Sequence, residues 1–297
     1  MRSPAADVRW WILAALAAGM IAGDTGHAPL ITTVTLTVMM CVSLHGLGFG
    51  RSELAGNKKY VLTGIAICYL IAGGITLLIG SFYHHELWLG WVMIAAVPCA
   101  ISVTSGTLIL KGDTKLAVIM VTAIYLTALI VTPLMTGVFI GEAVSPSEVL
   151  KYVGLFIIVP FIASVPLRKV AIDPKAKAVS INIMFFILVF ITFGANREFI
   201  LNEPAVVLWV AAGCAVRIGA VAVCMELLLK YMKMKKDRRI PMTLLSIWKN
   251  SALAMSMTLI LIPSKESVLP AALSLPLEMV CFMIMIWYYE KRCSNDE

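Results

Sequence analysis

The segment SIWKNSALAMS (residues 246–256) has the apolar character of a membrane-spanning helix, yet Lys249 and Asn250 stand side by side near its middle. A charged side chain at the centre of a bilayer costs from about 3 to more than 10 kcal/mol, so such residues face the protein interior and usually serve a function. The segment therefore predicts a transmembrane helix with a polar site around Lys249 inside the protein.

The whole chain shares this apolar character. Of its 297 residues, 60% are hydrophobic and only 14% are charged, which excludes an ordinary soluble domain. A membrane span needs about 20 apolar residues. Ten runs of this kind occupy residues 8–23, 28–49, 60–80, 88–110, 115–140, 148–170, 176–195, 205–230, 241–262 and 266–289. We therefore expect an all-α membrane protein with ten transmembrane helices.

The basic residues lie on one side of these spans. With the N-terminus inside, nineteen Lys and Arg residues fall in inner loops and tails, whereas only Arg197 and Lys265 fall outside. Because positive residues collect in cytoplasmic loops, we expect both termini to be cytoplasmic and the protein to lie in the plasma (inner) membrane. The basic run KYMKMKKDRR (230–239) is then an anchor against anionic lipid and not a nucleic-acid site. For residues 1–23, a cleaved signal peptide is the alternative to a first span.

Motifs of catalytic and cofactor sites are absent from the sequence. It has no HExxH, GxSxG, Walker-type or paired-aspartate motif, and six of its seven cysteines fall within predicted spans without a CxxC pair. We therefore expect neither an enzyme nor a bound metal or other cofactor.

A trace of duplication relates the two halves of the chain. The sequence SGTLIL (105–110) ends span four and SMTLIL (256–261) ends span nine, at an offset of 151 residues. In this register Pro98 falls on Lys249, so the two helix irregularities occupy equivalent places. Inverted repeats with broken helices are common in secondary transporters.

Pro98 predicts a break in span four, because proline removes a backbone donor and clashes with the preceding turn. The hydroxyl residues Ser102, Thr104 and Ser105 follow it. Backbone groups freed inside a membrane must be satisfied by protein or water, so a break here should line a cavity. A simple proline kink is the alternative.

Three segments resemble the bile acid:sodium symporter superfamily, which are ten-helix membrane transporters. LILKGDTKLAVIMVTAIYLTALIVTPL (108–134) resembles the hairpin between spans four and five, and KNSALAMSMTL (249–259) resembles the crossover segment of span nine. MMCVSLHGLGF (39–49) resembles the Met- and Gly-rich stretch of span two. The resemblance implies a five-plus-five inverted repeat in which broken helices four and nine cross.

The resemblance also implies two domains that rock against each other. A panel domain would comprise residues 1–59 (spans one and two) and 147–204 (spans six and seven). A core domain would comprise residues 60–146 (spans three to five) and 205–297 (spans eight to ten with a short cytoplasmic tail). Substrates of the family are mostly organic anions carried with sodium.

The family's sodium ligands are not conserved at the matching positions. The central acidic ligand falls on Leu245, its neighbouring glutamine on Lys249 and the glutamine of span three on Cys68, whereas Asn250 and Ser251 are retained. We therefore expect a secondary transporter of a small organic anion that works without sodium, with Lys249 in place of the cation. The expected substrate-binding residues are Ser102, Thr104, Ser105, Lys249, Asn250 and Ser251.

Glu278 adds a candidate for coupling. It lies in the middle of span ten at a depth comparable with that of Lys249. A buried lysine and a buried carboxyl can exchange protons, so Lys249 and Glu278 together predict coupling to a proton, or to an exchanged anion. A static Lys249–Glu278 or Arg217–Glu278 ion pair that only fixes helix packing is the alternative.

Two other functions fit the same residues. The motif VPCAIS (97–102) resembles the proline-cysteine motif of arsenite efflux transporters, which makes Cys99 a candidate ligand for a metalloid. The glutamate that this second family carries in span nine falls on Ala252. The third possibility is a non-transporting membrane sensor that keeps the fold without an ion site.

Overall fold

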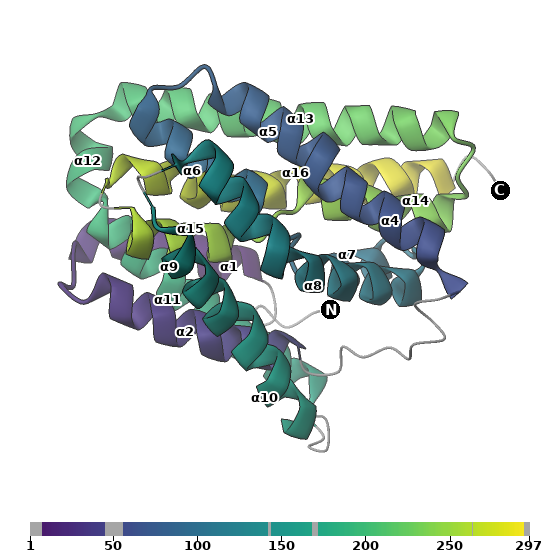
Figure 1. Ribbon diagram of the computed structural model, residues 1–297, viewed down its shortest axis with the longest axis horizontal. Helices are drawn as coiled ribbons and strands as arrows, with labels where there is room; N and C mark the ends of the chain where they lie inside the picture. Colours follow the sequence, from purple (N-terminus) through teal and green to yellow (C-terminus); the bar gives the residue numbers. More distant parts are fainter. Residues whose placement is uncertain (1–7, 45–55, 142–143, 168–171, 263, 294–297) are drawn as a thin grey trace.

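The computed structural model describes residues 8–44, 56–141, 144–167, 172–262 and 264–293, and regular structure in these ranges is helical apart from one isolated β-bridge (Figure 1). Residues 45–49 of the segment 39–49 lie outside them. The helical elements are α1 (Val8–Ala22), α2 (Ala28–Leu44), α4 (Lys58–Ala66), η2 (Ile67–Ile71), α5 (Ala72–Gly80), α6 (His85–Ala96), α7 (Val103–Ile109), α8 (Thr114–Phe139), α9 (Pro146–Val153), η4 (Gly154–Ile158), α10 (Val159–Leu167), α11 (Pro174–Ala195), α12 (Arg197–Asn202), α13 (Pro204–Tyr231), α14 (Lys236–Ile247), α15 (Ser251–Leu261), η5 (Glu266–Val268) and α16 (Leu269–Cys293).

Six described helices are long and apolar enough to cross a membrane. They occupy residues 58–80, 114–139, 147–164, 175–195, 204–231 and 266–289. Shorter apolar helices occupy residues 10–22, 28–43 and 251–261. The all-α membrane class is therefore confirmed for the described residues, whereas the count of ten spans and the inverted repeat stay predictions.

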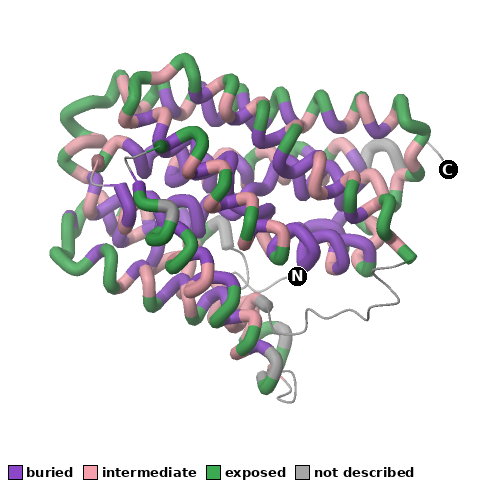
Figure 2. Tube along the Cα trace, viewed as in Figure 1, coloured by how far each residue is buried: buried purple, intermediate pink, exposed green. Residues whose placement is uncertain are grey.

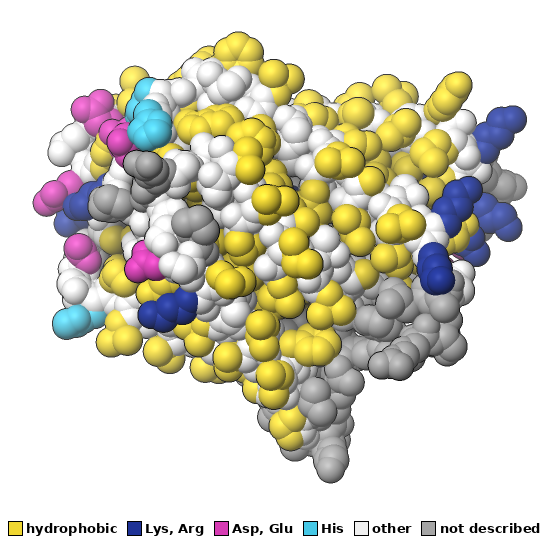
Figure 3. All heavy atoms as spheres, viewed as in Figure 1, with side chains coloured by type: hydrophobic (Ala, Val, Ile, Leu, Met, Phe, Trp, Pro, Cys, Tyr) yellow, Lys and Arg dark blue, Asp and Glu magenta, His cyan; other side chains and the backbone are white. Residues whose placement is uncertain are grey.

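The surface has an apolar middle and two polar ends, as a protein in a bilayer requires. Figure 3 shows apolar side chains over the middle of the molecule. Large hydrophobic residues that are exposed include Leu62, Ile130 and Leu208. Most basic side chains in this view gather at the end where α4 and α14 begin, and acidic and histidine side chains gather at the opposite end near α12. A wide apolar band between polar ends is what lipid contact demands.

The helices pack in two groups that meet mainly where α8 packs on α9 and around α15. One group contains α1, α2, α9, α10 and α11, and the other contains α4 to α8 and α13 to α16. Helix α15 packs on α6 and α16 of its own group and on α2, α9 and α11 of the other. Residues along α6 and α15 are almost all buried, and Figure 2 shows this buried zone at the centre of the molecule.

Two helical segments are interrupted in this central zone. Helix α6 ends at Ala96 and α7 begins at Val103, so the break expected at Pro98 is present. Val97 is extended, with ψ of 156°, as the residue before a proline prefers. The second interruption separates α14 from α15 and contains no proline. There the Asn250 side chain accepts a hydrogen bond from the backbone N–H of Leu253 at 3.1 Å, which caps the new helix.

Gly90 sets the close approach of α6 to η5 and α16. A Cβ atom at this position would lie 2.0 Å from the carbonyl oxygen of Ser267. Because overpacking a tight contact costs about 1–3 kcal/mol, Gly90→Ala is expected to lower the melting temperature of the detergent-solubilised protein. Gly74→Ala is the control, since a Cβ there meets nothing within 4 Å. Equal melting temperatures for the two variants would contradict this packing.

Candidate functional site

The two interruptions meet in an antiparallel β-bridge between Cys99 and Lys249. Its two hydrogen bonds, both 2.8 Å, run from Ala100 N to Trp248 O and from Asn250 N to Pro98 O. Inside a bilayer, backbone groups freed from a helix must find partners within the protein. Each interruption supplies partners for the other, and Lys249 is thereby fixed at the crossing point.

The Lys249 side chain is 1% exposed, and its ammonium contacts three groups that stabilise a cation. Its Nζ lies 3.3 Å from the carbonyl oxygen of Cys68, 3.5 Å from the Cys68 Sγ and 4.8 Å from the centre of the Tyr69 ring. Carbonyl oxygens and aromatic faces both attract positive charge. Among the described residues, no carboxylate lies within ion-pair distance of Lys249. Its charge is therefore accommodated without being neutralised by an acid.

Cys68 and Tyr69 lie in η2, a π-helical turn inserted between α4 and α5. Such turns are rare and are frequent at functional sites. This turn brings the Cys68 carbonyl and the Tyr69 ring to Lys249 from a segment about 180 residues away in the chain. The sequence analysis noted Cys68 by its position and did not identify Tyr69.

A pair of thiols lies beside the lysine. The Cys68 Sγ lies 3.5 Å from the Lys249 Nζ, Cys99 is the bridge partner of Lys249, and both cysteines are fully buried. Sulfur is the kind of ligand that soft metals and metalloids prefer. The crossing thus places two sulfur atoms and an ammonium in one cluster.

Asn250 connects the crossing to both groups of helices. Its Nδ2 donates to the Tyr125 hydroxyl on α8 at 2.8 Å and lies 3.9 Å from the Met40 sulfur on α2. The same side chain caps α15 through its oxygen. Because Asn250 contacts helices of both groups, a movement of one group relative to the other would change its contacts.

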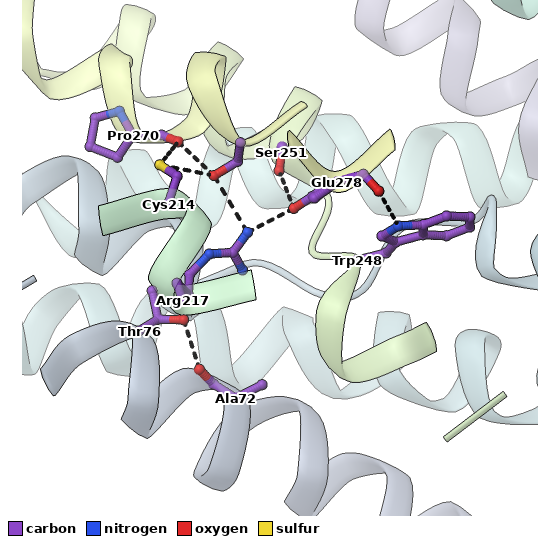
Figure 4. Close-up of polar contacts among 9 residues, drawn as sticks. Ala72, Thr76, Cys214, Arg217, Trp248, Ser251, Pro270 and Glu278 are labelled. Atoms are coloured by element: carbon purple, nitrogen blue, oxygen red, sulfur yellow. Dashed lines mark hydrogen bonds and ion pairs between the residues drawn. The ribbon is translucent and has the colours of Figure 1, made fainter. Parts of the chain in front are cut away.

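Glu278 pairs with Arg217 and not with Lys249 (Figure 4). The Arg217 Nη2 lies 2.9 Å from the Glu278 Oε1, and both side chains are buried. The same carboxylate oxygen accepts a hydrogen bond from the Ser251 hydroxyl at 3.1 Å. The Trp248 indole N–H donates to the Glu278 backbone carbonyl at 3.4 Å. Glu278 therefore bonds to residues at both ends of the second interruption, Trp248 and Ser251.

The Arg217 guanidinium is only partly satisfied. Its Nη2 also lies 3.4 Å from the Ser274 hydroxyl, whereas Nε and Nη1 have no partner among the described residues. A buried charge depends strongly on the partners that it keeps. Glu278 is accordingly the principal partner of Arg217.

The six predicted substrate-binding residues divide into two sets. Lys249, Asn250 and Ser251 gather at the crossing, and all are buried. In the other set Ser102 and Ser105 are exposed, and the Thr104 hydroxyl donates to the carbonyl of Ile101 at 2.9 Å. No hydrogen bond joins the second set to Lys249 in the described part of the chain.

Comparison with known proteins gives one family. A sequence model of the Sodium Bile acid symporter family matches residues 28–203, which is more than half of the chain. A search of curated proteins gives no match. The matched region includes Cys68, Tyr69 and Cys99 and ends before Lys249.

The Arg217–Glu278 pair can be tested by a double-mutant cycle. Arg217→Met and Glu278→Gln are each expected to lower the free energy of unfolding by about 3–5 kcal/mol, because each leaves a buried group without its partner. The double variant should lose clearly less than the sum of the two. Glu266→Gln, in the exposed pair with His84, is the control and should cost less than about 1 kcal/mol.

Thermal unfolding in detergent measures all four variants. Strictly additive losses in the double variant would show that Arg217 and Glu278 do not stabilise each other.

Proposed function

Since the chain belongs to the sodium bile acid symporter family and is therefore an integral membrane transporter and not an enzyme, we propose that it carries a small organic anion by alternating access without sodium. In this proposal the Lys249 ammonium provides the positive charge that a bound cation provides in the family. Membership of a transporter family implies two partners, which are a small-molecule substrate and the lipid bilayer.

The environment of Lys249 is the observation that carries this proposal. Its ammonium contacts a backbone carbonyl, a thiol and an aromatic face, which are groups that would also receive a bound cation. An ammonium on a side chain cannot dissociate from the protein as a sodium ion can, so no cation has to enter with the substrate to supply this charge. Because no described carboxylate pairs with it, this charge stays available to an anionic substrate.

The proposed substrate site begins at the second interruption. Lys249, Asn250 and Ser251 form its buried part, next to the N-terminus of α15, where the helix dipole favours negative charge. Ser102, Thr104 and Ser105 on the first turn of α7 form its accessible part. An anion would reach the hydroxyls first and the ammonium afterwards.

Alternating access follows from the way in which α15 lies between the helix groups. We assign residues 1–59 and 147–204 to a panel domain and 60–146 and 205–297 to a core domain. The contact between Asn250 and Met40 crosses this boundary. Rocking of one domain against the other would break this contact and open the site.

Glu278 is the proposed coupling residue, together with Lys249. The two do not pair directly, but Ser251 bonds to Glu278 and is two residues from Lys249 in the chain. Gain or loss of a proton on Glu278 would change its bonds to Ser251 and Arg217, and therefore the start of α15. Coupling to a proton follows from this arrangement, and exchange for a second anion is the alternative.

In the proposed topology the protein crosses the plasma (inner) membrane ten times. Both of its termini then lie in the cytoplasm. Six long helices, α1, α2 and the interrupted segments 85–109 and 236–261 account for ten spans. The basic end of the molecule in Figure 3 would then face the cytoplasm.

Metalloid efflux is the second candidate function, and the placement of the two buried cysteines Cys68 and Cys99 beside Lys249 is the observation that favours it. Two neighbouring thiols suit a soft metalloid better than Cys99 alone. The two functions differ in their response to Cys99→Ser. Organic-anion transport should survive this conservative change, whereas metalloid efflux, followed as arsenite resistance of expressing cells, should be lost.

Transport by purified protein in liposomes tests the first candidate. Uptake of labelled organic anions, including a conjugated bile acid, is expected to be equal in sodium chloride and choline chloride. Lys249→Met should reduce uptake at least about tenfold, which corresponds to 1.4 kcal/mol of lost stabilisation. Lys265→Gln, at an exposed lysine, is the matched control and should transport normally.

Melting temperatures separate a lost function from a lost fold. Lys249→Met is expected to unfold within a few degrees of the unmodified protein, since a methionine can fill the lysine's place. Uptake that requires sodium, or uptake that survives Lys249→Met, would contradict the proposal.

A further inference from the structure

A basic pocket lies between the first turn of α4 and the turn that joins α13 to α14. It has a volume of about 210 Å³, and its lining includes Lys59, Tyr60, Thr63, Lys233, Lys235 and Arg238. Pockets for drug-sized ligands occupy about 300–1,000 Å³. The volume here therefore suits a phosphate-sized group and excludes a whole lipid or nucleotide.

The cations of this pocket have no acidic partner among the described residues. Lys59, Lys233 and Lys235 make no ion pair within the described ranges, and Asp237, the acidic residue of the run 230–239, does not pair with them. Arg238 donates to the Tyr60 hydroxyl and stacks on its ring at 4.7 Å from the centre. Four positive charges thus line a small space to which the described part of the chain contributes no counter-charge.

The backbone holds one of these lysines in place at a cost. Lys233 has φ of 54°, a left-handed conformation in which glycine is preferred. The Lys233 N–H donates to the carbonyl oxygen of Lys230, and the Met234 N–H donates to the carbonyl oxygen of Leu229. These two bonds form a Schellman motif at the end of the helix, in which glycine is the usual residue at the position of Lys233. This ending fixes the backbone at Lys233, whose side chain lines the pocket.

The position of the pocket indicates a lipid as its occupant. It lies at the ends of two helices that are long enough to cross the membrane, residues 58–80 and 204–231. Leu62, Leu227 and Tyr231 next to it are 67%, 62% and 87% exposed, so their apolar surface faces lipid chains. Basic pockets between helix ends on the cytoplasmic side are suited to anionic head groups.

We propose that this pocket binds the phosphate of an anionic membrane phospholipid, whose acyl chains run along the neighbouring helices. The site is separate from the crossing of the interrupted helices and does not depend on the transported anion. Its occupant would tie the start of α4 to the turn before α14, the helix that leads to Lys249.

Thermal unfolding of the full chain in a neutral detergent tests this site. Phosphatidylglycerol, added in mixed micelles, is expected to raise the melting temperature in a saturable way. Phosphatidylcholine, inorganic phosphate and glycerol 3-phosphate should not do so at the same phosphate concentration. Because Lys233 and Lys235 both line the pocket, Lys233→Gln/Lys235→Gln should raise the apparent dissociation constant roughly thirtyfold.

The control removes the same charge elsewhere. Lys111→Gln/Lys175→Gln changes two exposed lysines outside the pocket and should weaken the lipid effect far less. If the pocket variant fails to fold, Lys235→Gln alone should shift the constant in the same direction by roughly fivefold.

Three results would overturn the proposal. Equal stabilisation by inorganic phosphate or glycerol 3-phosphate would show that the site takes a soluble phosphate. Equal stabilisation by phosphatidylcholine would show that charge is not recognised. Equal losses in the pocket variant and its control would show that diffuse surface charge, and not this pocket, attracts the lipid.

Discussion

Unpaired backbone groups in the middle of a membrane are the constraint on which this structure depends. Two helices are interrupted in the buried centre, and each unsatisfied N–H or C=O group there would cost several kcal/mol. The bridge between Cys99 and Lys249 removes this cost by joining one interruption to the other. The same bridge fixes where α15 starts and where the lysine side chain points. The packing of α6 and α15 and the polar contacts around them follow from that junction.

The centre of the molecule accommodates two buried cations in different ways. Arg217 is paired with Glu278, so this part of the network carries little net charge. Lys249 has a carbonyl, a thiol and an aromatic ring as neighbours, and no carboxylate among the described residues pairs with it. In a family of organic-anion transporters, a fixed charge of this kind can attract the substrate and also make a bound cation unnecessary. Ser251 lies at the crossing and bonds to Glu278 of the ion pair. A change in the protonation of Glu278 would therefore alter a hydrogen bond at the crossing.

The sequence was sufficient for features that depend on local chemistry. Apolar runs predicted the helical membrane class, and Pro98 predicted the first break. Other features depend on how distant segments pack. The second break contains no proline, and its bridge relates residues 99 and 249, which are 150 positions apart instead of the 151 that aligns SGTLIL with SMTLIL. Tyr69 was not identified, because its contact with Lys249 spans most of the chain. Depth alone could not decide whether Glu278 pairs with Arg217 or Lys249, since the direction of a side chain around the helix axis decides it.

The claim that Lys249 takes the place of bound sodium is tested most directly by melting the purified full chain in sodium chloride and in choline chloride at equal ionic strength. Binding at a hundredfold above the dissociation constant would stabilise the protein by about 2.7 kcal/mol. If the ammonium already occupies the cation's place, the two melting temperatures will be equal. A sodium-specific rise that saturates with concentration would show that a sodium site exists, and would contradict the role assigned to Lys249.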